Sequence, residues 1–268
     1  MKLSLLDKIR QNNPVVLTVA NTVTIAEVAN AVNAIGASPI MSQAKEEAEE
    51  LVGIAGAVTL NMGTWTAAQV EQMLVVGQFA NQQQRPVIVD PVAVGLPTRH
   101  QQFERLIGAV HPTVIRANAG EMAALSGDLS NSKGIDATGT IKNAAAIAKD
   151  VAQHFHCIAV MTGETDFVSD GQRVVSVHVG TPLFATHVGS GDMLSSVLGA
   201  FMAVETDTFE AAITATATFG AIGAWVVERE QLSLKQPGTF GVALMDGLSQ
   251  ATVAQLAPYL KNKVVEES

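Results

Sequence analysis

Short apolar runs alternate with longer amphipathic segments along the first 160 residues. The runs at residues 15–19, 57–60, 86–89, 113–116 and 158–161 have the length and composition of buried strands. Between them, apolar positions recur at helical spacing, which predicts helices over residues 24–35, 44–52, 66–83, 98–110 and 141–155. Strands that alternate with helices in this way form βαβ units. The pattern therefore predicts a largely parallel central sheet with helices on both faces.

The pattern changes in the second half of the chain. Residues 166–169 and 173–177 flank Asp170-Gly171, which predicts a β-hairpin. Residues 126–138 are rich in Gly, Asp, Asn and Ser and are expected to form a surface loop, whereas residues 195–260 have helical periodicity nearly throughout. Because no repeat or linker divides the sequence, we predict a single α/β domain over residues 1–268 with a helical C-terminal part.

Composition narrows the classes of partner. The net charge of -9 argues against nucleic acid or an anionic membrane, since both need a basic face, although one local pocket can still bind a nucleotide. Hydrophobic residues make up 48% of the chain and charged ones 15%, which suggests that other subunits cover part of the surface. The lone Cys157 lies in an apolar run and is expected to be a core residue. Neither a signal peptide nor an apolar run of about 20 residues is evident, so we expect a cytoplasmic protein.

Polar residues follow the predicted strands at the point where each strand ends. Asn21, Asn61 and Asp90 come after the first strands of the sheet. In open α/β sheets, ligands bind at the carboxyl ends of the strands. The residues that we expect at this edge are Asp90, Arg116, Asn118, Glu121, Thr162, Gly189, Gly191 and Asp192.

A glycine-rich loop, Val188-Gly-Ser-Gly-Asp192, opens directly into the predicted C-terminal helices. Glycines allow close approach of the backbone to a ligand, and the first amides of a helix attract anions, so Gly189, Ser190 and Gly191 form a candidate anion hole. Asp192 would repel a phosphate at this place. Its carboxylate is therefore either a simple helix N-cap or a base that removes a proton.

The sequence thus combines an anion-binding loop, acids that can hold Mg²⁺ through water, and one further acid that is free to act as a base. This combination is typical of enzymes that transfer phosphoryl groups. Structural alternatives remain at each position. Arg116 could form an ion pair with Glu121, Asp90 could begin a turn, and Met41 could be a core residue. The six histidines lack the spacing of metal ligands, which argues against a zinc site.

Several fragments carry a family resemblance over nearly the whole chain. They are Gly36-Ala-Ser-Pro-Ile-Met41, Asn61-Met-Gly-Thr64, Asp90-Pro-Val-Ala-Val-Gly95, Arg116-Ala-Asn-Ala-Gly-Glu121, Thr162-Gly-Glu-Thr-Asp166, Asp170-Gly171 and Gly189-Ser-Gly-Asp192. In this order and spacing, the sequence resembles the hydroxyethylthiazole kinases of the ribokinase-like superfamily. The resemblance implies a ribokinase-like fold and ATP-dependent phosphorylation of 4-methyl-5-(2-hydroxyethyl)thiazole at its hydroxyl, a step of thiamine salvage.

The resemblance also implies roles for individual residues. Met41 would line the thiazole site, with Asn21 nearby and the backbone of Gly189 close to the substrate hydroxyl. Arg116 and Thr162 match positions that contact ATP, with Asn118 beside them, while Asp90 and Glu121 match acids near Mg²⁺. Asp192 matches the catalytic base of the wider superfamily. Family members form homotrimers with the thiazole pocket between subunits.

The sequence departs from the family pattern at a few positions. Many members have cysteine in place of Asp192, and Ala93, Ala117, Gly120 and Ala20 replace other residues in the motifs. Three alternative functions stay open, namely a hydroxymethylpyrimidine kinase, a nicotinamide-nucleotide hydrate dehydratase, and a nucleotide-binding regulator without turnover. The Gly-Ala-Ser-Pro-x-Met segment argues against the first two. His187 matches no family position that we can interpret.

Overall fold

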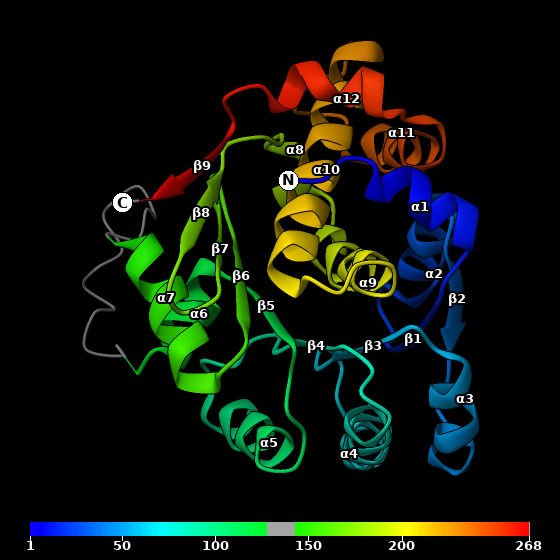
Figure 1. Cartoon of the computed structure of the whole chain (residues 1–268), viewed down its shortest axis with the longest axis vertical. Coiled ribbons are helices and arrows are strands. Elements are labelled where there is room, and N and C mark those ends of the chain that lie inside the picture. The colour runs from blue at the N-terminus through cyan, green and yellow to red at the C-terminus, as the bar shows by residue number, and fades with distance from the viewer. Residues whose placement is uncertain (128–142, 268) are drawn as a thin grey trace.

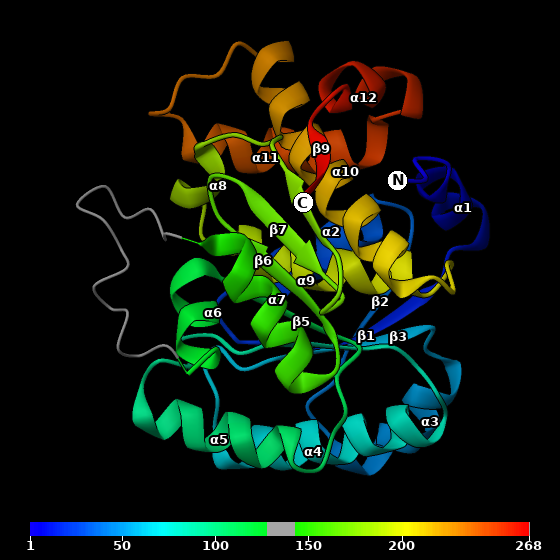
Figure 2. The same cartoon turned by 60° about the vertical axis from the view of Figure 1, so that its left-hand side comes forward.

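The computed structural model describes residues 1–127 and 143–267, which contain one sheet of nine strands (Figures 1 and 2). The strands are β1 (Val15–Val19), β2 (Ser38–Met41), β3 (Ala57–Asn61), β4 (Val87–Asp90), β5 (Val114–Asn118), β6 (Ile158–Thr162), β7 (Asp166–Ser169), β8 (Val174–Val177) and β9 (Val264–Glu267). Their order in the sheet is β2-β1-β3-β4-β5-β6-β7-β8-β9. The first six strands are parallel to one another, and the pairs from β6 to β9 are antiparallel. The predicted, largely parallel sheet is thus confirmed.

Helices cover both faces of the sheet (Figure 1). One face carries α1 (Leu5–Asn12), α2 (Ile25–Ala34), α8 (Leu183–Thr186), α9 (Ser190–Met202), α10 (Thr208–Arg229), α11 (Pro237–Gln250) and α12 (Val253–Leu260). The other carries a short 3₁₀ turn (Lys45–Glu47), α3 (Ala48–Ile54), α4 (Ala67–Gln82), α5 (Pro97–Ile107), α6 (Ala119–Leu125) and α7 (Ala144–Phe155).

Successive side chains along the buried strands point to alternate faces of the sheet, and this divides the core into two clusters. Val16 and Ile88 pack into the cluster under α9 and α10, whereas their neighbours Leu17 and Val89 pack into the cluster under α4 and α5. Successive side chains of a strand point to opposite faces, so a strand covered on both sides must be apolar throughout. This requirement explains why these strands are continuous apolar runs.

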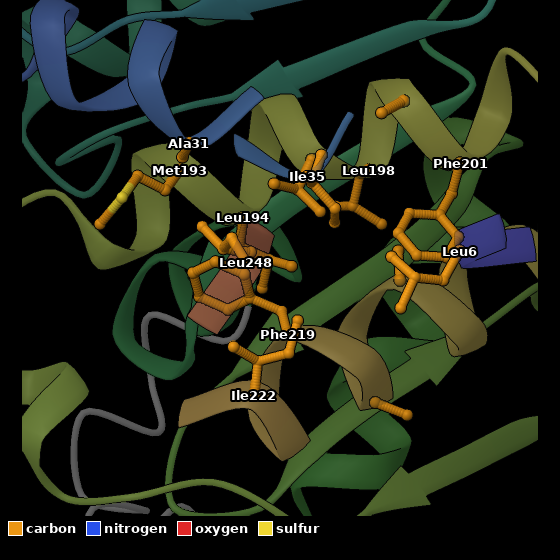
Figure 3. Close-up of a cluster of buried hydrophobic side chains, with 14 of the residues drawn as sticks. Leu6, Ala31, Ile35, Met193, Leu194, Leu198, Phe201, Phe219, Ile222 and Leu248 are labelled. Atoms are coloured by element: carbon orange, nitrogen blue, oxygen red, sulfur yellow. The ribbon is translucent and has the colours of Figure 1, made fainter. Parts of the chain in front are cut away.

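Helix α9 lies in the middle of the first cluster, as Figure 3 shows. Its side chains Met193, Leu194, Leu198 and Phe201 meet apolar residues from α1, α2, α10 and α11, namely Leu6, Ala31, Ile35, Phe219, Ile222 and Leu248. Every residue from 193 to 202 is buried. Such packing fixes the position of the helix N-terminus, which is the Gly189–Asp192 loop.

Most predicted elements are present with ends shifted by a few residues. The hairpin is confirmed as β7 and β8, and the C-terminal part is helical. Strand β9 was not predicted. The predicted loop at 126–138 lies mostly outside the described residues, and so does the predicted start of α7. The single domain over residues 1–268 stays a prediction.

One helix in the part of the chain that the structure describes, α10, has the length and apolar composition of a membrane span. However, 83% of its apolar window is buried inside the protein. Small residues dominate this helix, and Gly220 and Gly223 lie so close to Val179 and Phe184 that a side chain would not fit. These contacts are those of a central core helix.

Candidate active site

The polar residues at the strand ends meet at one edge of the sheet. Asn21 follows β1, Asn61 ends β3 and Asp90 ends β4, with Asn61 and Asp90 paired in register. The N-terminus of α9 lies over this edge, because the helix packs across β1, β3 and β4. The predicted meeting of these residues is confirmed.

Asp192 in the first turn of α9 is held by three donors. Its Oδ2 accepts hydrogen bonds from Asn21 Nδ2 at 2.9 Å and Thr24 Oγ1 at 2.6 Å, and its Oδ1 accepts one from Asn61 Nδ2 at 2.8 Å. The N-cap position belongs to Gly189, without a side-chain cap. The interpretation of Asp192 as a helix N-cap is therefore wrong, and its carboxylate faces the strand ends instead.

The Gly189 loop depends on backbone conformations that only glycine adopts easily. Gly189 has a φ of +95°, and a Cβ there would come within 2.8 Å of Thr24 Cγ2. The amide and hydroxyl of Ser190 both donate to the carbonyl of His187, at 3.3 and 2.8 Å. The Ser190 amide is thus already engaged, whereas the first-turn amides of Gly191 and Asp192 have no acceptor within the helix.

Asp90 is fully buried below this loop. Its Oδ2 accepts hydrogen bonds from Ser195 Oγ at 2.7 Å, Asn61 Nδ2 at 3.2 Å and Arg116 Nη1 at 3.4 Å, while its buried Oδ1 has no hydrogen-bond partner among residues 1–127 and 143–267. Burial raises the pKa of Asp90 to about 6, with the Arg116 charge opposing and the Asp192 charge adding to this shift. A buried carboxylate oxygen without a partner is a place where a cation or a water molecule fits.

Arg116 connects Asp90 to the next strand. Its Nη2 donates to Thr162 Oγ1 at 2.5 Å, and its Nη1 lies 3.4 Å from Asp90 Oδ2. The ion-pair partner is Asp90, and the alternative pairing with Glu121 is wrong. The guanidinium also packs against Gly191, where any side chain would overlap it.

Glu121 and Asn118 form a capping box at the start of α6. Asn118 Oδ1 accepts from the Glu121 amide at 3.0 Å, and Glu121 Oε2 accepts from the Asn118 amide at 2.9 Å. Glu121 Oε1 accepts from the amide of Ala93, which has a φ of +58°. Both oxygens of Glu121 are thus bound by backbone amides, and Asn118 pairs in register with Thr162.

Met41 lies farther along the edge, at the end of β2. It pairs in register with Thr18 of β1 and packs, half-buried, against the cluster that surrounds α9. Strand β2 is the edge strand of the sheet on the β1 side. Met41 is thus next to the β1 end but outside the hydrogen-bonded network.

Two residues of the network were not predicted. Thr24 looked like an ordinary residue at a helix start, and Ser195 looked like one of many small residues in α9. Ser195 is three positions after Asp192, the spacing that puts two residues on one face of a helix, and this spacing was a usable signal. The signal for Asn61 was present in its strand-end position, although no role was predicted for it.

The carboxylates of the site do not form a metal cage by themselves. Within residues 1–127 and 143–267, no group of three or more His, Cys, Asp or Glu side chains is placed to hold a metal ion. Mg²⁺ commonly takes one or two carboxylates together with substrate phosphates and water. Asp90 with its free Oδ1 fits that pattern.

This chain is similar in sequence to named relatives over nearly its full length. A sequence model of the hydroxyethylthiazole kinase family matches residues 6–254. The chain is 51% identical to a hydroxyethylthiazole kinase of Levilactobacillus brevis over 96% of its length and 97% of the relative's. It is 48% identical to one of Lactiplantibacillus plantarum, which covers 97% and 99% of the two chains.

Solved structures agree with these relatives. A hydroxyethylthiazole kinase protein from Pyrococcus horikoshii OT3 superposes with a TM-score of 0.88 at 30% identity, covering 99% of this chain and 98% of the other. A ribokinase-like superfamily protein from Enterococcus faecalis, 15% identical, shares the fold with a TM-score of 0.63 over 94% and 96% of the two chains. With a ribokinase-like fold and this extent of identity to named relatives, the chain belongs to the hydroxyethylthiazole kinase family.

Proposed function

We propose that this protein transfers the γ-phosphoryl group of ATP to the hydroxyl of 4-methyl-5-(2-hydroxyethyl)thiazole in thiamine salvage. The observation that carries the proposal is the Asp192 carboxylate, held over the strand ends at the N-terminus of α9 and beside Asp90. The family and the relatives named hydroxyethylthiazole kinase support the choice of substrate.

Asp192 is the proposed base. Two donors, Asn21 and Thr24, occupy its Oδ2, whereas only Asn61 binds Oδ1. A carboxylate oxygen can accept two hydrogen bonds, so Oδ1 keeps room for the hydroxyl of the substrate. Proton removal by a positioned base contributes roughly 10² to 10⁴ in rate, and positioning and charge stabilisation supply the rest.

Arg116, Thr162 and Asn118 form the proposed nucleotide side of the site. The Arg116 guanidinium is fixed between Asp90 and Thr162 and can bind a phosphate through its remaining N–H groups. At the other side of the transferring group, the amides of the Gly189–Asp192 loop offer donors to a developing negative charge. Since Ser190 already donates to His187, the Gly191 and Asp192 amides are the proposed donors.

Asp90 Oδ1 and, at longer range, Glu121 are the proposed acids for Mg²⁺. When bound with ATP, Mg²⁺ neutralises charge on the β- and γ-phosphates. The buried Asp90 Oδ1 has no partner in the part of the chain that the structure describes, so it is free for the ion or for one of its water molecules. Ser195, Asn61 and Arg116 hold the other oxygen and thereby fix the direction of the free one.

We further propose a cytoplasmic homotrimer with the thiazole pocket at the subunit interface, near Met41, Gly189 and Asn21. Three valines beside the Gly189 loop support an apolar pocket there. Val188 is 72% exposed, Val23 is 68% exposed next to Thr24, and Val242 is 67% exposed on α11 next to Gly241, which packs on His187. Exposed apolar side chains on segments that meet at this loop favour a neighbouring subunit and an apolar ring as their partners.

The proposal is tested by measuring ADP formation from ATP and Mg²⁺ with a panel of alcohols. We expect turnover with the thiazole alcohol, and little with hydroxymethylpyrimidine at the same concentration. Preference for the pyrimidine would indicate the other kinase. Conversion of a nicotinamide-nucleotide hydrate without phosphorylated product would indicate the dehydratase, and nucleotide binding without turnover would indicate a regulator.

The interface is tested by light scattering of the wild type and of Val188→Asp and Val242→Asp variants. A trimer that dissociates in either variant, with a raised KM for the alcohol, supports a pocket between subunits. Unchanged mass and unchanged KM in both variants contradict it.

A further inference from the structure

We infer that Asn61 is a positioning residue that sets the distance between Asp192 and Asp90 through the two N–H groups of one side-chain amide. Its Nδ2 donates to Asp192 Oδ1 at 2.8 Å and to Asp90 Oδ2 at 3.2 Å. The side chain is 3% exposed and ends β3, the strand between β1 and β4. The inference rests on the roles proposed above for Asp192 and Asp90.

The orientation of the Asn61 amide is fixed by its oxygen. Oδ1 accepts hydrogen bonds from the Gly63 amide at 2.9 Å and from Asn21 Nδ2 at 3.1 Å. A flipped amide would place its oxygen against two carboxylates and its N–H groups against two donors. All four hydrogen-bonding groups of the amide are therefore used, in one orientation only.

The neighbours of Asn61 keep this geometry rigid. Gly63 packs against Asn21 so closely that a Cβ at position 63 would lie 2.5 Å from Asn21 Cβ. Asn21 Oδ1 in turn accepts from the amides of Val23 and Thr24, which ties it to the start of α2. Asn61 thus has a preorganised amide that needs no reordering when substrates bind.

The residue type suits a place between two acids. A neutral amide donates to both carboxylates without neutralising either charge, so one acid stays available as a base and the other for a cation. An aspartate at position 61 would add a third carboxylate to a buried site, and a lysine would form an ion pair with the base. In-line transfer requires the acceptor hydroxyl and the phosphate-bound ion at a fixed separation, and reacting groups misplaced by about 1 Å can lose about 10²-fold in rate.

The test is a double-mutant cycle of Asn61→Ala and Asp192→Ala, measured as kcat and as KM for both substrates at saturating Mg²⁺. We expect Asn61→Ala to lower kcat by roughly tenfold to a hundredfold, which is the effect of losing a hydrogen bond to a charged group. KM for the thiazole alcohol should change little. In the Asp192→Ala background, Asn61→Ala should lower kcat by about twofold or less, because the carboxylate that Asn61 positions is already absent.

Thr59→Val is the matched control, since Thr59 is also buried in β3 but donates only to the carbonyl of Ser195, at 3.4 Å. Its kcat should stay within about twofold of wild type. Asn61→Ser, which keeps a polar side chain but lacks the two N–H groups and adds no charge, replaces Asn61→Ala if the latter fails to fold. This variant should also have a lower kcat than wild type, and the same substitution should lower kcat by a smaller factor in the Asp192→Ala background.

The outcomes separate the inference from the proposed function. Equal losses of kcat from Asn61→Ala with and without Asp192 would overturn the inference while leaving the base assignment intact. Wild-type turnover in Asp192→Ala alone would overturn the base assignment and the inference with it. A loss of kcat in Thr59→Val as large as that in Asn61→Ala would show a general effect of β3 packing and would overturn the inference as well.

Discussion

The guanidinium of Arg116 lies directly against Gly191, so closely that a methyl group at position 191 would overlap it. Arg116 is anchored there by Asp90 and Thr162. The strand that is proposed to bind ATP and the helix that carries the base therefore meet at this contact. Arg116 leaves no room for a side chain at position 191, so glycine is required there whether or not the loop also contacts a ligand.

We expect Gly191→Ala to raise KM for ATP by tenfold or more, because the new Cβ displaces Arg116 and breaks a hydrogen bond of a charged group, worth about 1.5–3 kcal/mol. Gly53→Ala is the matched control, since no atom lies within 4 Å of a Cβ at this position of α3. Initial rates at varied ATP concentrations measure the effect. An unchanged KM for ATP in Gly191→Ala would show that Arg116 does not act on the nucleotide from this position.

Asp192→Ala should lower kcat by about 10² to 10⁴ and leave KM for the thiazole alcohol within a few-fold of wild type. The three donors that now bind the carboxylate lose their acceptor but keep their own positions through other bonds of Asn21 and Asn61. Steady-state kinetics with the exposed Asp246→Ala of α11 as control provide the measurement. Turnover near that of wild type would remove Asp192 from the mechanism.

The two acids proposed for Mg²⁺ should differ in their effects. Asp90→Asn changes the carboxylate whose Oδ1 is without a partner among the described residues, so the half-saturating Mg²⁺ concentration should rise by roughly 10-fold to 100-fold. Both oxygens of Glu121 are bound by backbone amides, so Glu121→Gln should shift the half-saturating Mg²⁺ concentration by less than about threefold. Titration of activity with Mg²⁺ tests the ranking. Equal shifts would indicate that Glu121 also binds the ion directly.

Much of the site followed from the order of strands in the sequence. Because parallel strands end at a common edge, the strand-end positions of Asn21, Asn61 and Asp90 were enough to predict that these residues meet. The hydrogen-bonding pattern was not predictable. Thr24 and Ser195 join the network only because α9 crosses the sheet at a particular place and angle, and these depend on the packing of the whole helical face.

Strand β9 shows another limit of sequence patterns. Val264-Val-Glu-Glu267 has an exposed, acidic half and resembles a polar tail. It forms a strand because the last edge of the sheet, β8, offers free backbone groups to it. This pairing depends on where the chain returns to the sheet after α12. Local strand propensity does not predict that position.

Asp90 should make the stability of the metal-free protein depend on pH. Its pKa is about 6 in the folded protein, mainly through burial, and its ordinary value is 3.8. Between these values the folded protein holds a proton that the unfolded chain has released, so the free energy of unfolding falls as pH rises. Above about pH 6 the stabilisation is lost in full, which amounts to about 3 kcal/mol for a shift of about two pKa units.

Urea unfolding of wild type and Asp90→Asn in EDTA between pH 4 and pH 7.5 measures this effect. The wild-type free energy of unfolding should fall relative to that of the variant by about 2 kcal/mol across this range, because Asp90 is already partly ionised in the unfolded chain at pH 4. Loss of the Arg116 contact in the variant adds a constant offset without a slope, because a guanidinium does not titrate in this pH range. A difference between the two proteins that is independent of pH, or that rises with pH, would mean that Asp90 is ionised in the folded protein well below pH 6.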